Sequence, residues 1–184
     1  IRRQRQMCIR DRFITVLNNT ITGFIATNGI APQCAMRIGL HSRNHTIQRN
    51  RIFNNTSSTF EAGIWLDEST ISRTGVTTYA SGNTLIEQNH IYNNNRNGIA
   101  LSSSGTGTTL NNRITQNLIY DNTGLAIDLN IGAPGSAITV TTNDNTDADN
   151  GPNNVLNFPV IDSVKKTPSH IIIYGKVAAG AYME

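Results

Sequence analysis

The sequence lacks the features that mark a membrane-spanning, helical or disordered protein. No apolar run approaches the roughly 18 residues that a membrane-spanning helix needs. The strong helix formers Lys and Glu are scarce, which excludes a helical bundle and a coiled coil. Disorder is also excluded, because 38% of the residues are hydrophobic and the net charge is only +3. The abundant residues are Asn, Ile, Thr and Gly, which favour strands and turns, so the 184 residues predict a turn-rich, all-β protein.

The positive charge is confined to the first residues of the chain. Residues 1–12, IRRQRQMCIRDR, carry five Arg and one Asp, a net charge of +4, which leaves −1 for the rest. A nucleic-acid surface is therefore not expected. The string MCIRDR resembles a translated sequencing adapter, so we expect residues 1–12 to form no domain; the alternative is a genuine basic arm. Cys8 lies in this stretch, which leaves Cys34 alone and predicts no disulfide framework.

A repeat begins after this stretch. Its pattern is I-x-x-N-x-I-[FY]-x-N, each copy is accompanied by a second short strand such as 63–67 or 98–102, and a weaker copy contains Val16, Asn19 and Ile21. The full copies are TIQRNRIFNN (46–55), LIEQNHIYNN (85–94) and RITQNLIYDN (113–122). The Ile columns are Ile47, Ile86 and Ile114, and Ile52, Ile91 and Ile119. The Asn columns are Asn50, Asn89 and Asn117, and Asn55, Asn94 and Asn122.

These columns predict a coil in which each repeat is one turn. Successive turns would pair as parallel strands about 4.8 Å apart, with the Ile columns filling a narrow interior. Asn between two strands can adopt the left-handed conformation of a sharp corner. Its amide can also bond the equivalent Asn on the next turn, which would form a structural ladder of hydrogen bonds. We therefore predict a solenoid of about four turns over residues 13–132.

Residues 44–129 resemble the right-handed parallel β-helix repeats of the pectate-lyase-like superfamily. The string from Gly124 to Ile161, with its DADNGPNN core, is similar to the end of β-helix domains in large secreted or surface-displayed bacterial proteins. This resemblance implies a single-stranded right-handed β-helix, a connecting segment or cap over 133–163, and the truncated start of a β-sandwich-like module over 164–184. It also implies an extracellular or cell-surface location.

The enzymes of that superfamily act on the outer face of one strand column. Here alternation predicts two outward rows: Gly39, Trp65, Ala100 and Asp128 in the first, and His41, Asp67, Ser102 and Asn130 in the second. The candidate catalytic residues are His41 beside Asp67, with Asp128 further along and Trp65 as a surface for sugar stacking. The two acids would lie about 12 Å apart, whereas glycosidase pairs need about 5 to 9.5 Å. The constellation is a poor active site, and ordinary exposed polar residues are the favoured interpretation.

Two further groups could bind ligands. Phe53, Tyr92 and Tyr120 form an aromatic column, which is either a sugar-contacting strip or, as we favour, a structural stack. The acidic segment 143–151 could hold calcium through Asp144, Asp147 and Asp149, although it departs from the EF-hand pattern; the alternative is a polar turn.

The sequence thus predicts a binding or structural module, adhesive or carbohydrate-contacting, with no catalysis in this chain. The expected partner is a polysaccharide or a cell-surface glycan, not nucleic acid, with no membrane insertion and no cofactor apart from calcium. The expected state is a monomer that is part of a longer chain. The alternative is part of a polysaccharide lyase, glycoside hydrolase or epimerase acting on uronate-type polysaccharides, whose catalytic turns lie elsewhere.

Overall fold

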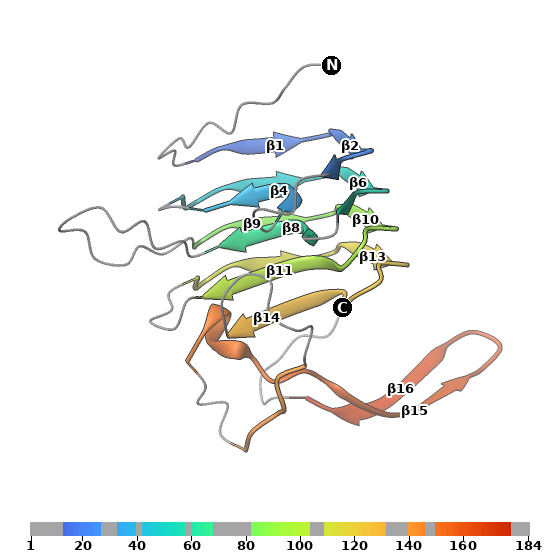
Figure 1. Ribbon diagram of the computed structural model, residues 1–184. Coiled ribbons are helices and arrows are strands. Elements are labelled where there is room, and N and C mark those ends of the chain that lie inside the picture. The colour runs from blue at the N-terminus through green and yellow to red at the C-terminus, as the bar shows by residue number, and fades with distance from the viewer. Residues whose placement is uncertain are drawn as a thin grey trace.

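The computed structural model describes residues 13–26, 33–39, 42–57, 60–67, 82–103, 109–131, 140–145 and 150–177. Three parallel four-stranded sheets run along one stack of coils, as Figure 1 shows. This arrangement confirms the predicted parallel β-helix of about four turns. Residues 1–12 lie outside the described residues, so the expectation for them stays a prediction.

Each coil contributes one strand to each sheet. The first sheet contains β1 (Thr15–Leu17), β5 (Thr46–Gln48), β9 (Leu85–Glu87) and β12 (Arg113–Thr115). The second contains β2 (Thr20–Thr22), β6 (Arg51–Phe53), β10 (His90–Tyr92) and β13 (Leu118–Tyr120). The third contains β4 (Gln33–Ile38), β8 (Phe60–Asp67), β11 (Asn97–Ser103) and β14 (Ile127–Ile131). A short parallel pair, β3 (Ile25–Ala26) with β7 (Thr56–Ser57), extends two of the coils.

The interior consists of the predicted Ile columns. Ile47 pairs in register with Ile86, and Ile52 with Ile91, and all four side chains are fully buried. Ile64, Leu66, Ile99 and Leu101 of the third sheet complete the same core cluster. β-branched side chains suit this narrow interior because their restricted rotamers lose little freedom on stacking.

The sharp corners use a different residue from the one that the sequence predicts. The left-handed conformation belongs to the residue before each ladder Asn: Arg49, Gln88 and Gln116 at the first corner have φ of 56°, 55° and 54°. At the second corner the left-handed residues are Asn54, Asn93 and Asp121, with φ of 53°, 51° and 52°. The expectation that the ladder Asn itself has positive φ is therefore wrong. The ladder residue must direct its backbone N–H and side-chain amide along the stack. The residue before it therefore adopts the left-handed conformation of the turn.

The six ladder residues are joined from coil to coil. The backbone N–H and Nδ2 of Asn50 both donate to Oδ1 of Asn89, at 2.9 and 3.0 Å. Asn89 donates in the same way to Oδ1 of Asn117, at 3.0 and 2.9 Å. Its Nδ2 also donates to the carbonyl of Ile47 on the preceding coil, at 2.9 Å. The second column repeats this pattern through Asn55, Asn94 and Asn122. The side-chain amides of the two ladder columns are thereby hydrogen-bonded from coil to coil.

A third corner, which the sequence analysis did not identify, joins the third sheet of one coil to the first sheet of the next. Its left-handed residues are Asn44, Asn83 and Asn111, with φ of 63°, 54° and 58°. Two of the side chains that follow them accept a backbone hydrogen bond from the preceding coil: His45 Nδ1 from Ile14 at 3.1 Å, and Asn112 Oδ1 from Thr84 at 3.0 Å. The sequence did contain a signal for the third corner, because these three Asn residues recur with the same spacing as the ladder residues.

A cap closes the C-terminal end of this corner. The 3-10 segment η1 (Pro152–Val155) brings Asn153 against Asn112, and Pro152 and Val155 are buried. Residues 143–144 and 157–158 then bond one another through Asn143 and Asn157. Asn153 therefore extends the hydrogen-bonding pattern of the third corner beyond the last parallel strand.

Glycine at the start of the third sheet is required by packing. A Cβ on Gly63 would lie 2.9 Å from the carbonyl oxygen of Gly98 and 2.9 Å from Cγ2 of Ile91. Neither atom can move without disturbing the strand or the core, so the glycine that opens GIWLD (63–67) has a steric origin.

A hairpin follows the cap and projects from the base of the stack in Figure 1. It consists of β15 (Val160–Lys166) and β16 (Ile171–Lys176), paired antiparallel. β15 spans the expected module boundary at residue 164, and the expectation of a β-sandwich-like module stays a prediction. All its residues are exposed apart from the half-buried Thr167 at the turn.

Candidate functional site

Trp65 and the two acids expected to form a catalytic surface are buried. Trp65 and Asp67 are each only 1% exposed, and Ala100, Ser102 and Asp128 are buried as well. Trp65 packs with Ala62, Ala100 and Cys34 in a second cluster outside the main core. The prediction that Trp65 is a surface for sugar stacking is therefore wrong, because its ring is already covered by protein.

The register of the first coil also differs from the prediction. Arg37, not Gly39, pairs with Trp65, so the alignment that placed His41 beside Asp67 is displaced by two residues. His41 lies outside the described residues. The basic neighbour that the structure gives to Asp67 is Arg37.

Arg37, Trp65, Asp67 and Ser102 form one polar network. The guanidinium of Arg37 forms an ion pair with Oδ2 of Asp67 and lies 4.4 Å from the centroid of the Trp65 ring. The indole N–H of Trp65 donates to Oγ of Ser102 at 2.8 Å, and that hydroxyl donates to Oδ1 of Asp67 at 3.4 Å. Both carboxylate oxygens of Asp67 therefore have partners, and the cluster is a packing element with its polar groups satisfied.

Asp128 belongs to a separate network. Asn97 donates from Nδ2 to Oδ2 of Asp128 at 2.9 Å, and Oδ1 of Asn97 accepts from the backbone of Leu125 at 2.9 Å. Burial raises the pKa of the Asp128 carboxyl, while the hydrogen bond from Asn97 and the charge of Arg96 act in the opposite direction. Asp67 and Asp128 are thus held in two different buried networks.

The exposed surface lies instead on the outer side of the second sheet. One outward row of this sheet contains Thr20, Arg51, His90 and Leu118, all exposed. The other contains Phe53, Tyr92 and Tyr120, whose rings stack with centroids 4.9 and 5.0 Å apart and interplanar angles of 2°. The corner residues on either side are also exposed, so we call this whole surface the second-sheet face.

The aromatic column is a stack within the protein. Each inter-ring spacing is close to the distance between paired strands, so no sugar ring can enter between neighbours. Tyr92 is covered on both faces, by Phe53 and Tyr120, and its hydroxyl accepts a hydrogen bond from Arg51 at 2.9 Å. Only ring edges and the outer face of the terminal Tyr120 remain for contact with a ligand.

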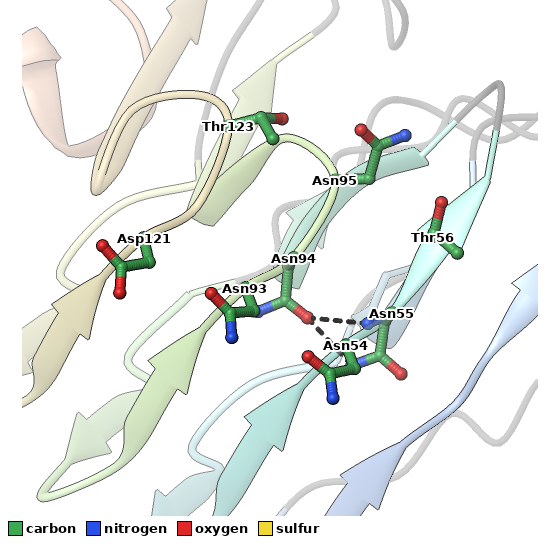
Figure 2. Close-up of a pocket in the computed structure, with 8 residues that line it drawn as sticks. All are labelled: Asn54, Asn55, Thr56, Asn93, Asn94, Asn95, Asp121 and Thr123. Carbon is green, nitrogen blue, oxygen red and sulfur yellow. Dashed lines mark hydrogen bonds between the residues drawn. The ribbon is translucent and has the colours of Figure 1, made fainter.

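A polar hollow of about 380 Å³ lies at the second corner. Figure 2 shows its two rows of side chains, with the Asn94–Asn55 ladder bond between them. One row is Asn54, Asn93 and Asp121, and the other is Thr56, Asn95 and Thr123. All six are exposed and lie on three consecutive coils, so each coil presents two polar side chains, which are amides, hydroxyls and, at Asp121, a carboxylate.

A second hollow of about 450 Å³ lies on the opposite side of the same face, at the first corner. Its lining contains Arg49, Arg51, His90 and Gln88, together with the ladder residue Asn50, and no acidic residue. We refer to it as the basic hollow, and to that at the second corner as the polar hollow.

The predicted calcium segment is described only in part. The backbone N–H of Asp144 donates to Asn157 Oδ1 at 3.0 Å, and Asn157 Nδ2 donates to the carbonyl of Asp144 at 2.8 Å. Asp147 and Asp149 lie outside the described residues. In the described part of the chain no three His, Cys, Asp or Glu residues gather as metal ligands, and calcium binding stays a prediction.

Comparison with known proteins defines the class. A family model described as "Right handed beta helix region" matches residues 7–158, up to the last residue bonded in the cap. The chain therefore belongs to the right-handed β-helix family. No curated protein and no solved structure matches it. Within the described ranges, no helix has the length and apolar character needed to cross a membrane.

Proposed function

We propose that this chain is a non-catalytic, extracellular or cell-surface β-helix module that binds a glycan across the second-sheet face. The observation that carries the proposal is the polar hollow, where each of three successive coils presents two exposed polar side chains: amides, hydroxyls and one carboxylate. Sugar hydroxyls both donate and accept hydrogen bonds, and these groups supply partners of both kinds.

The spacing of the groups supports an extended ligand. Neighbouring coils are separated by about 4.8 Å, a length similar to that of one pyranose residue in a chain. A polysaccharide lying parallel to the helix axis can therefore present one sugar to each coil. The rigid ladder beneath the hollow holds Asn54 and Asn93 in fixed positions, which lowers the entropy lost on binding.

Binding without catalysis fits the placement of the acids. Asp67 is ion-paired and buried, Asp128 is buried against Asn97, and Asp121 is the single carboxylate of the polar hollow. A glycosidase mechanism needs two carboxyl groups on either side of one bond. The alternative of a lyase, hydrolase or epimerase would show itself as turnover of polygalacturonate or alginate that is lost in Asp67→Ala.

The proposal is tested by titrating the full chain with soluble xylan, galactomannan and dextran in affinity electrophoresis and calorimetry. The decisive variant is Asn93→Gly, which removes one amide from the hollow, and its control is Asn83→Gly at the third corner. Both positions are exposed and left-handed, with φ of 51° and 54°, so both variants keep the backbone unstrained. We expect Asn93→Gly to weaken binding about fivefold to tenfold and Asn83→Gly to leave it unchanged. No binding to any polymer, or equal binding by the two variants, would overturn the proposal.

A further inference from the structure

The basic hollow contrasts with the polar hollow on the other side of the same face. Its lining has two Arg and one His but no acid, although the chain without residues 1–12 has a slight negative charge. The register of β6 and β10 places Arg51 and His90 side by side on adjacent coils. Arg49 lies at the adjoining left-handed corner, two residues before Arg51 in the sequence. Three nitrogen-bearing side chains thus converge from two coils.

The arginines are held by neighbours that carry no charge. Arg49 donates from Nε to Oε1 of Gln88 at 3.1 Å, and Arg51 donates to the hydroxyl of Tyr92 at 2.9 Å. The guanidinium of Arg51 also lies 5.3 Å from the centroid of the Phe53 ring. A guanidinium has five N–H donors, and these contacts orient the group without using most of them. Neutral partners leave the positive charge available, whereas a carboxylate partner would cancel it.

One acid, Glu87, lies next to the hollow, directly before Gln88 in the sequence. Its Oε2 accepts a hydrogen bond from Nε2 of Gln48 at 2.8 Å, and the same Nε2 donates at 3.5 Å to Gln88 Oε1, the atom that accepts from Arg49. Glu87 is not among the described residues that line the hollow. Arg49 and Arg51 are therefore the permanently charged groups of the described lining.

We propose that the basic hollow binds an oxyanion carried by the glycan, either a carboxylate or a sulfate ester. This inference rests on the proposed function and gives it a ligand class: a charged chain lying along the helix axis on the second-sheet face, with an anionic substituent at Arg49, Arg51 and His90. Guanidinium groups match oxyanions because two parallel N–H donors meet two oxygens in one plane. The adjacent imidazole supplies another N–H donor.

The test uses three polymers with one backbone: dextran, carboxymethyl-dextran and dextran sulfate, each titrated into the full chain. The variants are Arg51→Gln and Arg49→Gln, and the matched control is Arg113→Gln, an exposed arginine on the first sheet. We expect an anionic dextran to bind at least about tenfold more tightly than dextran, and each hollow variant to lose about tenfold in affinity. The control should lose less than about twofold. Binding by carboxymethyl-dextran alone assigns a carboxylate, and binding by dextran sulfate alone assigns a sulfate ester.

Two outcomes overturn the inference. One is equal affinity for all three dextrans, and the other is equal loss in Arg51→Gln, Arg49→Gln and Arg113→Gln, which would indicate a diffuse charge effect. Circular dichroism of each variant checks the fold, and Arg49→Gln keeps the test valid if Arg51→Gln unfolds. Failure of this inference can be distinguished from failure of the proposed function. Binding of neutral polymers that depends on Asn93 would keep the function and remove the oxyanion, while binding that depends on Arg51 but not Asn93 would do the reverse.

Discussion

Asn112 and Asn153 exchange two hydrogen bonds although they are 41 residues apart: the backbone N–H of Asn112 donates to Oδ1 of Asn153 at 3.0 Å, and Nδ2 of Asn153 donates to the carbonyl of Asn112 at 2.8 Å. A parallel strand of a further coil would satisfy the same two groups. Asn153 therefore stands in for that coil at the third corner.

Asn153→Gly is expected to destabilise the protein by about 1 to 3 kcal/mol, because it removes both bonds and leaves polar groups of a half-buried corner unpaired. The control is Asn154→Gly. Both residues have positive φ, 47° and 56°, so glycine relieves strain equally and the difference isolates the side chain. Urea denaturation of the two variants measures it, and equal midpoints would show that the cap contributes nothing through this amide.

Ile91→Ala is expected to lower the free energy of unfolding by about 2 to 5 kcal/mol. Ile91 is fully buried between Ile52 and Ile119 in the stacked column, and the coils on both sides prevent the interior from collapsing around the cavity. Leu118→Ala, at an exposed position of the neighbouring strand, should change stability by less than about 0.5 kcal/mol. Similar effects in both variants under chemical denaturation would contradict the assignment of the core.

Asn89→Asp should destabilise by about 2 to 4 kcal/mol at neutral pH. The change keeps the shape but removes the amide donor to Ile47 and Asn117 and adds a buried charge. Asn93→Asp is the control, because Asn93 is exposed and Asp121 occupies the equivalent corner naturally. Its thermal midpoint should match that of the unchanged protein. A ladder that tolerated aspartate at residue 89 would not depend on its amide.

Asp128→Asn should stabilise the protein at neutral pH. Burial raises the pKa of Asp128 in the folded state above its usual value of 3.8, so the folded state binds the proton more tightly than the unfolded state. The free energy of unfolding therefore falls as the pH rises from the unfolded to the folded pKa, and the loss persists above it. Asparagine keeps an acceptor for Asn97 and removes the charge. Denaturation should show a gain near pH 7 that vanishes below about pH 3; a gain independent of pH would contradict the electrostatic cause.

The coil and its ladders could be predicted from sequence because their residues recur in registered columns. The Ile columns and Asn50, Asn89 and Asn117 each repeat one physical requirement on every coil, so the pattern alone identifies it. The left-handed position was misassigned because Arg49 and Gln88 are not residues that usually mark it. At the third corner, His45, Thr84 and Asn112 share the ladder position but not a residue type, so the corner showed only in the column of left-handed residues that precede them.

The candidate site was harder to predict. The alternation of side chains along a strand shows on which side of the sheet each one lies, but it does not show whether that side is buried. Trp65 and Asp67 do point away from the main core, yet both are buried in a second layer of contacts. Arg37 could not be assigned as the partner of Asp67 because the first coil departs from the repeat, which shifts its register by two residues. The exposed side chains of the polar hollow are polar, and such residues leave no periodic apolar signal.

The ladders also give the molecule a direction. In both columns the amide-to-amide bonds all run one way: each Nδ2 that bonds another ladder residue donates to Oδ1 on the later coil. The first and the last ladder residues of a column therefore differ in the groups that they have bonded, which makes the two ends of the stack chemically unlike. A coil grafted or duplicated in the same chain direction can join these rows, whereas an inverted coil would set oxygen against oxygen. Further coils can therefore extend the ladders in only one chain direction.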